Sequence, residues 1–424
     1  MQLQDIATIL GLQGVKIVDL HYIKDGNNEI REAQFRIEPL EAKQSCPNCG
    51  NADVVKKGKN GNKKTAHLNI AVTPCVLIIP NIRLQCKNCY TGFPHTYTFV
   101  EGKERYTKPF KAHIYEIAVG STVEHAAALT GAPYSTSERI FKEAAKKVAA
   151  NTLDKVQQQA AASTKLVMGL DDFAIRKGHN YNTGFHDLRG ESMIGIAEGR
   201  TIKELDAYME KNPQLAALKP YAVVMDLARG YHAFVAAYYP DAIRVADRFH
   251  VNGYIMDALN EIRRRVGNGL NAKSRTDLNR KRHLLSKRNE SLSPKQREEL
   301  KILLNYSHEL ACAYALKEQL ADWYDCSSDY RSAFAGFTRW LEDGHRLCIP
   351  EIEVALKTFE NWRSEILNYH KCRFTNGIVE GRNGKIKSIQ RRHFFLRNRL
   401  FYEALCIIEC NKEIARDQFK LFWT

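Results

Sequence analysis

The sequence has no long hydrophobic run. Nowhere do its 424 residues approach the ~20 consecutive apolar residues that a membrane span requires. Its first residues, MQLQDIATILGLQG, show no basic segment followed by an apolar one, so no secretory signal is visible. We therefore expect a cytoplasmic, nucleoid-associated protein without a membrane partner.

Cysteine does not occur in the even number that a disulfide framework requires. There are eleven cysteines and no export signal. Four of them form two CxxC pairs, in CPNCG (Cys46 and Cys49) and in CKNCY (Cys86 and Cys89). We interpret the remaining cysteines, which are scattered, as small buried hydrophobic residues.

Acidic residues are fewer than basic ones. The chain has 48 Asp and Glu against 63 Lys and Arg, which gives a formal net charge of +15. This balance favours a polyanionic partner. An anionic membrane surface is an alternative, but neither end of the chain carries a basic amphipathic anchor. We therefore expect nucleic acid.

The two CxxC pairs predict a zinc ribbon. Between them lie a basic stretch from Lys56 to Lys64, which we expect to be rich in turns, and the apolar strand VLIIPNIRLQC. Two thiolates from each pair complete one tetrahedral Zn²⁺ site, and four thiolates leave no open position, so the zinc would be structural. Four unrelated buried cysteines are the alternative. A redox role is less favoured because no thioredoxin-like βαβ pattern is present.

Residues 105–150 have a helical pattern in which HAAALTGAPYSTSERIFK suggests a helix-turn-helix. Gly131 would lie in the turn, and the serines at 135 and 137 would cap a second helix whose N-terminus faces DNA. This predicts DNA contacts from Ser135, Ser137 and Arg139. An ordinary helical linker is the alternative.

From residue 166 strands and helices alternate. LVMGLDDFAIRKG is expected to be a buried strand that ends at two aspartates, and two antiparallel strands follow, with a turn at 188–190. A helix, a strand ending at Asp226, a second helix and a strand ending at Asp247 complete the pattern. Three strands, helix, strand, helix, strand is the order of the RNase H-like sheet. Residues 253–370 are helical and charged, and we interpret them as an insertion.

These patterns predict an α+β multidomain protein. We expect a zinc-binding N-terminal region at 1–100, with a zinc-ribbon-like structure, and a helix-turn-helix DNA-binding region at 101–163. An RNase H-like catalytic domain would occupy 164–424, with its helical insertion at about 253–370.

Carboxylates at particular places in this topology indicate metal-dependent chemistry on DNA. Phosphoryl transfer requires an activated water or 3′-hydroxyl and a stabilised leaving oxygen, and two divalent ions about 3.5–4 Å apart provide both. Asp171 and Asp226 end neighbouring strands, and Glu380 in a late helix would complete a site for Mg²⁺ or Mn²⁺. Asp172 competes with Asp171, but alternation along the strand sends the two to opposite faces, and we favour Asp171.

A second pair, Asp247 and His250 in DRFH, could orient this site or contact DNA. A structural His–Asp pair is an equally good interpretation. Single aspartates at strand ends are more often turn or cap residues, so the joint pattern carries the hypothesis.

The late helix FTNGIVEGRNGKIKSIQRR places one acid in a basic run. Glu380 lies in its first turn. A salt bridge on a solvated helix is the simple interpretation; a metal ligand beside a DNA backbone is the sharper one. The latter predicts DNA contacts from Arg382, Asn383, Lys385, Lys387, Arg391 and Arg392.

The chain resembles DDE-type insertion-sequence transposases of the ISL-three family over nearly its whole length. The matching segments are CPNCG with CKNC, RYTKPF, GLDDFAIRKGHNY, VVMDLARGY, PDAIRVADRFHV, LSPKQREELKILL and TNGIVEGRNGKIKSIQRR. The resemblance implies cutting and joining of DNA at the element's terminal inverted repeats, with Asp171, Asp226 and Glu380 as the triad. The family usually has Asp-Glu where this chain has Asp171-Asp172.

The expected function is therefore an active transposase with double-stranded DNA (element ends and target) as its partner, assembled as a homo-oligomer on DNA. A catalytically inactive DNA-binding repressor is the first alternative, and the intact triad argues against it. Another RNase H-like nuclease, such as a junction resolvase, is the second. Two N-terminal DNA-reading modules argue against that function.

Overall fold

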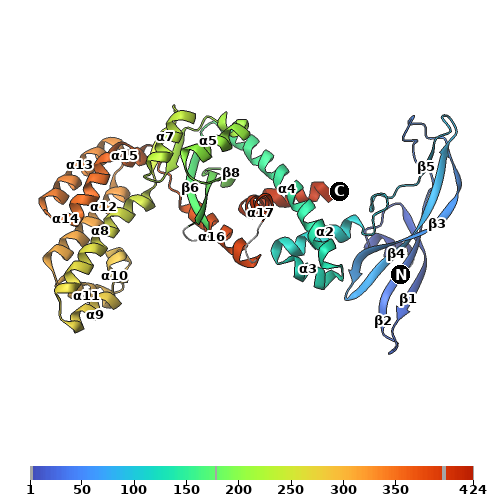
Figure 1. The fold of residues 1–424 in the computed structure, drawn as a ribbon, viewed down its shortest axis with the longest axis horizontal. Helices are drawn as coiled ribbons and strands as arrows, with labels where there is room; N and C mark the ends of the chain where they lie inside the picture. Colours follow the sequence, from blue (N-terminus) through green and yellow to red (C-terminus); the bar gives the residue numbers. More distant parts are fainter. Residues whose placement is uncertain (1–2, 177–178, 394–397, 424) are drawn as a thin grey trace. The chain divides into compact units, whose positions relative to one another are not determined.

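The structure is a computed structural model that describes residues 3–176, 179–393 and 398–423 (Figure 1). Its contacts divide the chain into two compact units. The first comprises Met1–Asn151, Arg391–Ile408 and Lys412–Thr424, and the second comprises Thr152–Gln390 and Glu409–Asn411. The predicted boundaries near residues 100 and 163 stay a prediction, but the C-terminal segments group with the first unit rather than with residues 164–390.

The first unit begins with a short helix and a five-stranded sheet. These elements are α1 (Leu3–Ile9), β1 (Val15–Lys24), β2 (Ile30–Pro39), β3 (Val54–Ile70), β4 (Thr73–Cys86) and β5 (Gly92–Pro94). The strand order is β1-β2-β4-β3, with β5 paired to β4. Alternation along β4 buries Leu77 and Ile79 completely against Ile37 of β2, so this sheet has a core of its own.

The stretch from Lys56 to Lys64 is not rich in turns, as we expected, but lies within the long strand β3. Its partner β4 is strongly apolar and offers a continuous ladder, so pairing overrides the local turn signals. The glycines are accommodated as irregularities. Gly58 has a φ of 151° and Gly61 a φ of 68°, and the register shifts beside them.

Helices make up the rest of the first unit. They are α2 (Lys108–Gly120), α3 (Val123–Thr130), the first part of α4 (Tyr134–Ala162), and the C-terminal α17 (Arg399–Cys410) and α18 (Lys412–Trp423). Gly131, with a φ of 74°, ends α3 in the predicted turn. The C-terminal helices pack on the earlier ones through stacked Tyr115 and Phe419, with ring centroids 4.6 Å apart.

The predicted cap of the second helix is wrong. Helix α4 begins at Tyr134, so Ser135 and Ser137 lie inside its first turn rather than before it. Ser137 is completely buried, because this position lies on the face of α4 that also carries the buried Ile140 and Phe141.

The second unit contains a mixed five-stranded sheet. Its elements are β6 (Val167–Arg176), β7 (His179–Asp187), β8 (Ser192–Glu198), α5 (Ile202–Lys211), α6 (Pro213–Ala216), β9 (Ala222–Met225), α7 (Arg229–Tyr238) and β10 (Ile243–Ala246). The strand order is β10-β9-β6-β7-β8. Strands β9 and β10 run parallel to β6, whereas β7 and β8 complete an antiparallel meander. The predicted element order is thus observed.

Strand β6 does not end at its two aspartates, as we expected. Asp171 and Asp172 pair with Gly184 and Thr183 of β7, and the strand continues to Arg176. The expectation failed because β6 has two neighbouring strands of different extent. Its pairing with β9 stops at Gly169, whereas its pairing with β7 continues to Arg176.

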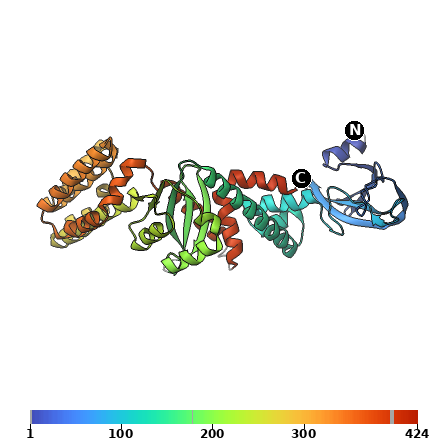
Figure 2. The same ribbon diagram turned by 90° about the horizontal axis from the view of Figure 1, so that it is seen from above.

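A bundle of helices follows β10, as predicted (Figure 2). It comprises α8 (Arg248–Gly269), α9 (Ala272–Arg280), α10 (His283–Ser286), a 3-10 turn (Asn289–Ser291), α11 (Pro294–Leu304), α12 (His308–Cys326), α13 (Tyr330–Arg346), α14 (Pro350–Asn361) and α15 (Arg363–Cys372). Tyr324, Phe337 and Leu356 are fully buried in its core. Helix α8 begins directly after Asp247, earlier than the predicted start of the insertion.

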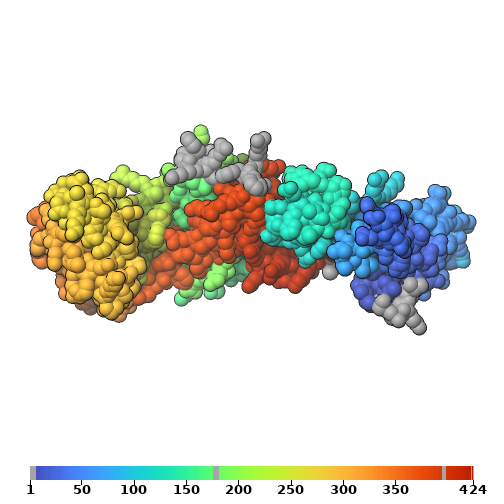
Figure 3. All heavy atoms as spheres, turned by 90° about the horizontal axis from the view of Figure 1, so that it is seen from below, coloured from blue at the N-terminus to red at the C-terminus, as the bar shows by residue number. Residues whose placement is uncertain are grey.

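Helix α16 (Gly377–Arg392) returns to the sheet, and its outer surface is visible in orange-red in Figure 3. None of the helices in the described parts of the chain is both long enough and apolar enough to cross a membrane.

The prediction that the cysteines outside the two pairs are all buried is partly wrong. Cys75, Cys406 and Cys410 are buried, but Cys326 and Cys348 are exposed. Cys326 is the last residue of α12, and Cys348 follows the end of α13 by two residues.

Candidate functional site

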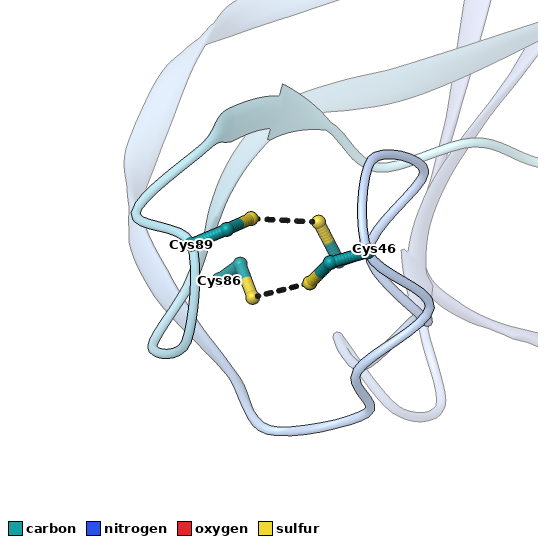
Figure 4. A group of neighbouring side chains, drawn as sticks. Cys46, Cys86 and Cys89 are labelled. Carbon is teal, nitrogen blue, oxygen red and sulfur yellow. Dashed lines mark hydrogen bonds between the residues drawn. The ribbon is translucent and has the colours of Figure 1, made fainter.

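The four cysteines of the two CxxC pairs converge in the first unit (Figure 4). The Sγ atoms of Cys46 and Cys89 are 3.5 Å apart, and those of Cys49 and Cys86 are 3.6 Å apart. Every Sγ lies within 4.8 Å of the others. A tetrahedral zinc ion with Zn–S bonds of about 2.3 Å would hold its sulfurs roughly 3.8 Å apart, so the four side chains fit a closed, structural Zn²⁺ site.

Hydrogen bonds surround two of these thiols, and they favour the thiolate form of Cys89. The Asn88 backbone N–H donates to Cys86 Sγ at 3.4 Å. Bonds with the Thr91 side chain and backbone lower the pKa of the Cys89 thiol to about 5. A lowered pKa favours the form of the thiol that binds a metal.

The second cluster is acidic and lies between β6 and β9. These parallel strands pair Gly169 with Val224, and the same register two residues further places Asp171 beside Asp226. Carboxylate oxygens of both residues and a ring nitrogen of His250 all lie within 4.8 Å of one another. Asp172 points elsewhere and forms an ion pair of 3.2 Å with Arg200, as expected for alternation along a strand.

His250 lies between two carboxylates. Its Nδ1 is 2.8 Å from Asp226 Oδ1 and 3.1 Å from Asp247 Oδ2. Only the contact with Asp247 has hydrogen-bond geometry. Asp226 Oδ1 is therefore buried beside the imidazole without a hydrogen-bond donor among the described residues.

Asp247 is buried and joins two helices. Its side chain is fully buried, and Oδ1 accepts from the Asn376 backbone N–H at 2.9 Å. It therefore links the start of α8 to the start of α16. The orienting role that we considered for Asp247 and His250 stays a prediction.

Burial and mutual repulsion dominate the electrostatics of the cluster. Burial, and then the charge of Asp226, raises the pKa of Asp171 to about 7. Burial also raises the pKa of Asp226. The carboxylates of Asp226 and Asp247 beside its ring raise the pKa of His250 to about 10. Two facing carboxylates are a ligand set that suits a hard divalent cation.

Helix α16 is fixed to β6 at two points. The Asn376 side chain, just before the helix, donates to Leu170 O at 2.9 Å. Asn383 Nδ2 donates to Asp171 Oδ2 at 2.7 Å. Glu380 lies one turn before Asn383 on the same side of the helix, but its side chain is exposed and it is outside the group of atoms within 4.8 Å. Its role as a ligand stays a prediction.

Two residues of α16 that we predicted to contact DNA face the sheet instead. Arg382 and Asn383 are 5% and 7% exposed. Arg382 Nη1 donates to His186 Nδ1 at 3.3 Å, and Asn383 is engaged with Asp171. With the buried Ser137, these side chains offer no surface to DNA, because each lies on the packed face of its helix.

The other predicted DNA contacts have accessible side chains. Lys385, Lys387 and Arg391 are exposed on α16, and Arg392 is half-buried and donates to Val119 O at 2.8 Å. Ser135 and Arg139 are exposed on α4.

Sequence reasoning missed His186 and Asn376. His186 is completely buried, and burial together with the charge of Arg382 lowers its pKa to about 3, so the neutral ring accepts the guanidinium hydrogen bond. Asn376 was recognisable as a helix-start residue, but its bond to β6 joins positions 206 residues apart. No local pattern encodes such a contact.

We predict that Gly169→Ala destabilises the protein because α16 packs closely over this position. A Cβ here would lie 2.7 Å from both Asn376 Oδ1 and Leu188 Cδ2. Overpacking of this kind costs about 1–3 kcal/mol, which denaturant unfolding would measure. Gly253→Ala, in α8, is the matched control because its Cβ would meet nothing within 4 Å. Equal stability of the Gly169 variant and the wild type would contradict the close docking of α16.

Two family models match this chain. A family model described as the zinc finger of transposases IS204/IS1001/IS1096/IS1165 matches residues 42–89, which contain the four cysteines. A second family model, described as a transposase of the ISL3 type, matches residues 168–405, which contain both aspartates. The protein is thus a transposase with an N-terminal zinc ribbon. The chain belongs to the ISL3 (ISL-three) family.

The matches to related proteins cover much of the chain. It is similar to the transposase for insertion sequence element IS1001 of Bordetella parapertussis, with 24% identity over 403 residues that cover 92% of this chain and 94% of the relative. It is also similar to the transposase for IS1557 of Mycobacterium tuberculosis (strain CDC 1551 / Oshkosh), with 24% identity over 264 residues that cover 57% of this chain and 59% of the relative.

Proposed function

We propose that this chain binds the terminal inverted repeats of its insertion sequence and catalyses metal-dependent DNA strand cleavage and strand transfer. The observation that carries the proposal is the convergence of Asp171 and Asp226 from adjacent parallel strands. Within the described residues, one buried oxygen of Asp226 has an ion-pair contact with His250 but accepts no hydrogen bond. The strand order β10-β9-β6-β7-β8 supports an RNase H-like catalytic domain. Membership of the ISL3 family supports the reaction.

The side chains of the site would have two kinds of function, metal binding and orientation of the metal ligands. Asp171 and Asp226 would hold Mg²⁺ or Mn²⁺, with Glu380 as a third ligand. When bound, the metal would activate the attacking water or 3′-hydroxyl and stabilise charge on the leaving oxygen. Asn383 fixes the orientation of Asp171, and Asp247 fixes that of His250 beside Asp226. No covalent protein–DNA bond is needed, so no nucleophilic side chain is assigned.

Binding of double-stranded DNA would use the basic surfaces. Lys385, Lys387 and Arg391 on the exposed side of α16 suit the phosphates near the acidic pair. We interpret helices α3 and α4 as a helix-turn-helix that would recognise the element's end. The basic strand β3 would also contact this end. Two ends must be joined to a target, so we expect a homo-oligomer on DNA in the nucleoid.

Glu380→Gln tests the proposal through the third ligand. The substitution keeps the size of the side chain but removes a charge, so we expect Mg²⁺-dependent cleavage of a labelled duplex carrying the element's end to fall roughly a thousandfold or more. Gel shift should show unchanged binding.

Glu342→Gln is the control, because this exposed carboxylate lies on α13. If the Glu380 variant cuts like the wild type, Glu380 is not a ligand. If the wild type binds the duplex but does not cut it, the protein is better described as a repressor derived from a transposase.

A further inference from the structure

A cavity separate from the acidic cluster opens between α7 and the junction of α14 with α15, which lie near each other in Figure 1. Its volume is about 410 Å³, within the range of about 300–1,000 Å³ typical of small-molecule pockets. It is lined by Arg229, His232, Asn361, Trp362 and Glu365.

The cavity is close to the acidic pair along the chain. Arg229 is the first residue of α7 and follows Asp226 by three positions. Three residues span at most roughly 11 Å. A DNA strand whose phosphate lies at Asp226 could therefore also reach Arg229 in the lining of the cavity.

The inner wall of the cavity is fixed by internal contacts. His232 donates from Nε2 to Glu365 Oε1 at 3.1 Å, and Glu365 is only 8% exposed. The His232 ring meets the Trp362 ring edge-to-face, with centroids 5.6 Å apart. Glu365 thus fixes His232, whose ring packs against the indole, while part of Trp362 remains exposed.

The other polar groups of the lining remain available. Within the described residues, the side chains of Arg229, Asn361 and Trp362 make no hydrogen bond or ion pair. An aromatic face stacks on any nucleobase, a side-chain amide can pair with a base edge, and a guanidinium suits a phosphate or a guanine. Together these three groups fit one nucleotide.

We propose that this cavity receives an unpaired DNA base next to the cleaved phosphate, stacked on Trp362. The proposal rests on the proposed transposase function and adds a base-binding subsite formed partly by the helical insertion. Enzymes that act on DNA extrude bases when a duplex hides the reacting atoms, and a pocket that stacks the base offsets the cost of unpairing.

A double-mutant cycle between protein and base tests the proposal. The full-length protein, as wild type and as Trp362→Ala, is titrated with duplexes carrying the element's end. In each duplex one nucleotide flanking the cut is either intact or abasic. We expect Trp362→Ala to weaken binding of the intact duplex about 5- to 150-fold, and to have almost no effect when the abasic site occupies one particular position.

Trp362→Phe should restore most of the affinity because it keeps an aromatic face. Tyr330→Ala is the matched control, since this exposed aromatic lies in the same helical bundle but does not line the cavity. The proposal is overturned if Trp362→Ala changes binding equally at every abasic position, or does not change it at all. It is also overturned if the Phe variant is no better than the Ala variant.

The same cycle on a single-stranded oligonucleotide separates the two proposals, because its bases are unpaired whether or not the end is recognised. A wild type that neither recognises nor cuts the element's end counts against the transposase mechanism. The subsite is then decided by the oligonucleotide: coupling between Trp362 and one base supports it, and equal binding of intact and abasic strands overturns it.

Discussion

Asp171→Asn and Asp226→Asn are each expected to abolish DNA strand cleavage, with a loss of roughly a thousandfold or more. Each substitution preserves side-chain shape and removes one of two facing carboxylates that would hold the metal. Because the two acids repel each other in a buried site, either change should leave the protein as stable as before or slightly more stable. Cleavage of a labelled element end, with thermal unfolding in parallel, measures both effects.

Asp172→Asn is the matched control for these variants. It makes the same chemical change at the adjacent residue, but this carboxylate pairs with Arg200 on the other side of β6. We expect cleavage within a few-fold of the wild type, because an exposed ion pair contributes only about 0–1 kcal/mol. If the Asp172 variant lost activity while the Asp171 variant kept it, our assignment of the metal ligand on β6 would be reversed.

Cys86→Ser is expected to empty the zinc site and unfold the ribbon locally. Cys86 is completely buried at the end of β4, in a small core with Val54, Leu84 and Phe93. This core is small, so it depends on the metal, whose binding contributes about 10–16 kcal/mol in isolated zinc-finger peptides. The larger core around Leu77 is separate and should keep the rest of the sheet folded.

Zinc content by atomic absorption should fall from one ion per chain to nearly none, and hydrogen exchange should increase only around the two CxxC turns. Cys326→Ser is the control because this exposed cysteine lies outside the cluster. Full zinc content in the Cys86 variant would show that the four thiolates do not act as one site. Loss of protection throughout the sheet would show that its two cores are not independent.

Several features of this protein could be predicted from local sequence. The spacing of the CxxC pairs was sufficient because a two-residue gap forms a tight turn that brings two sulfurs together. The order of strands and helices from residue 166 was readable from periodicity. The placement of Asp171 and Asp172 on opposite faces of the sheet followed from alternation along a strand, which depends only on backbone geometry.

Other features required the folded chain, because they depend on contacts between residues far apart in sequence. Pairing with β4 makes a strand of the Gly- and Lys-rich stretch in β3. The bond from Asn383 to Asp171 joins positions 212 residues apart and involves a buried side chain that we expected to contact DNA. The cavity beside Trp362 exists only because the insertion folds back against α7. Local patterns specify which residues share one face of a helix. Packing of the whole chain decides which other element covers that face.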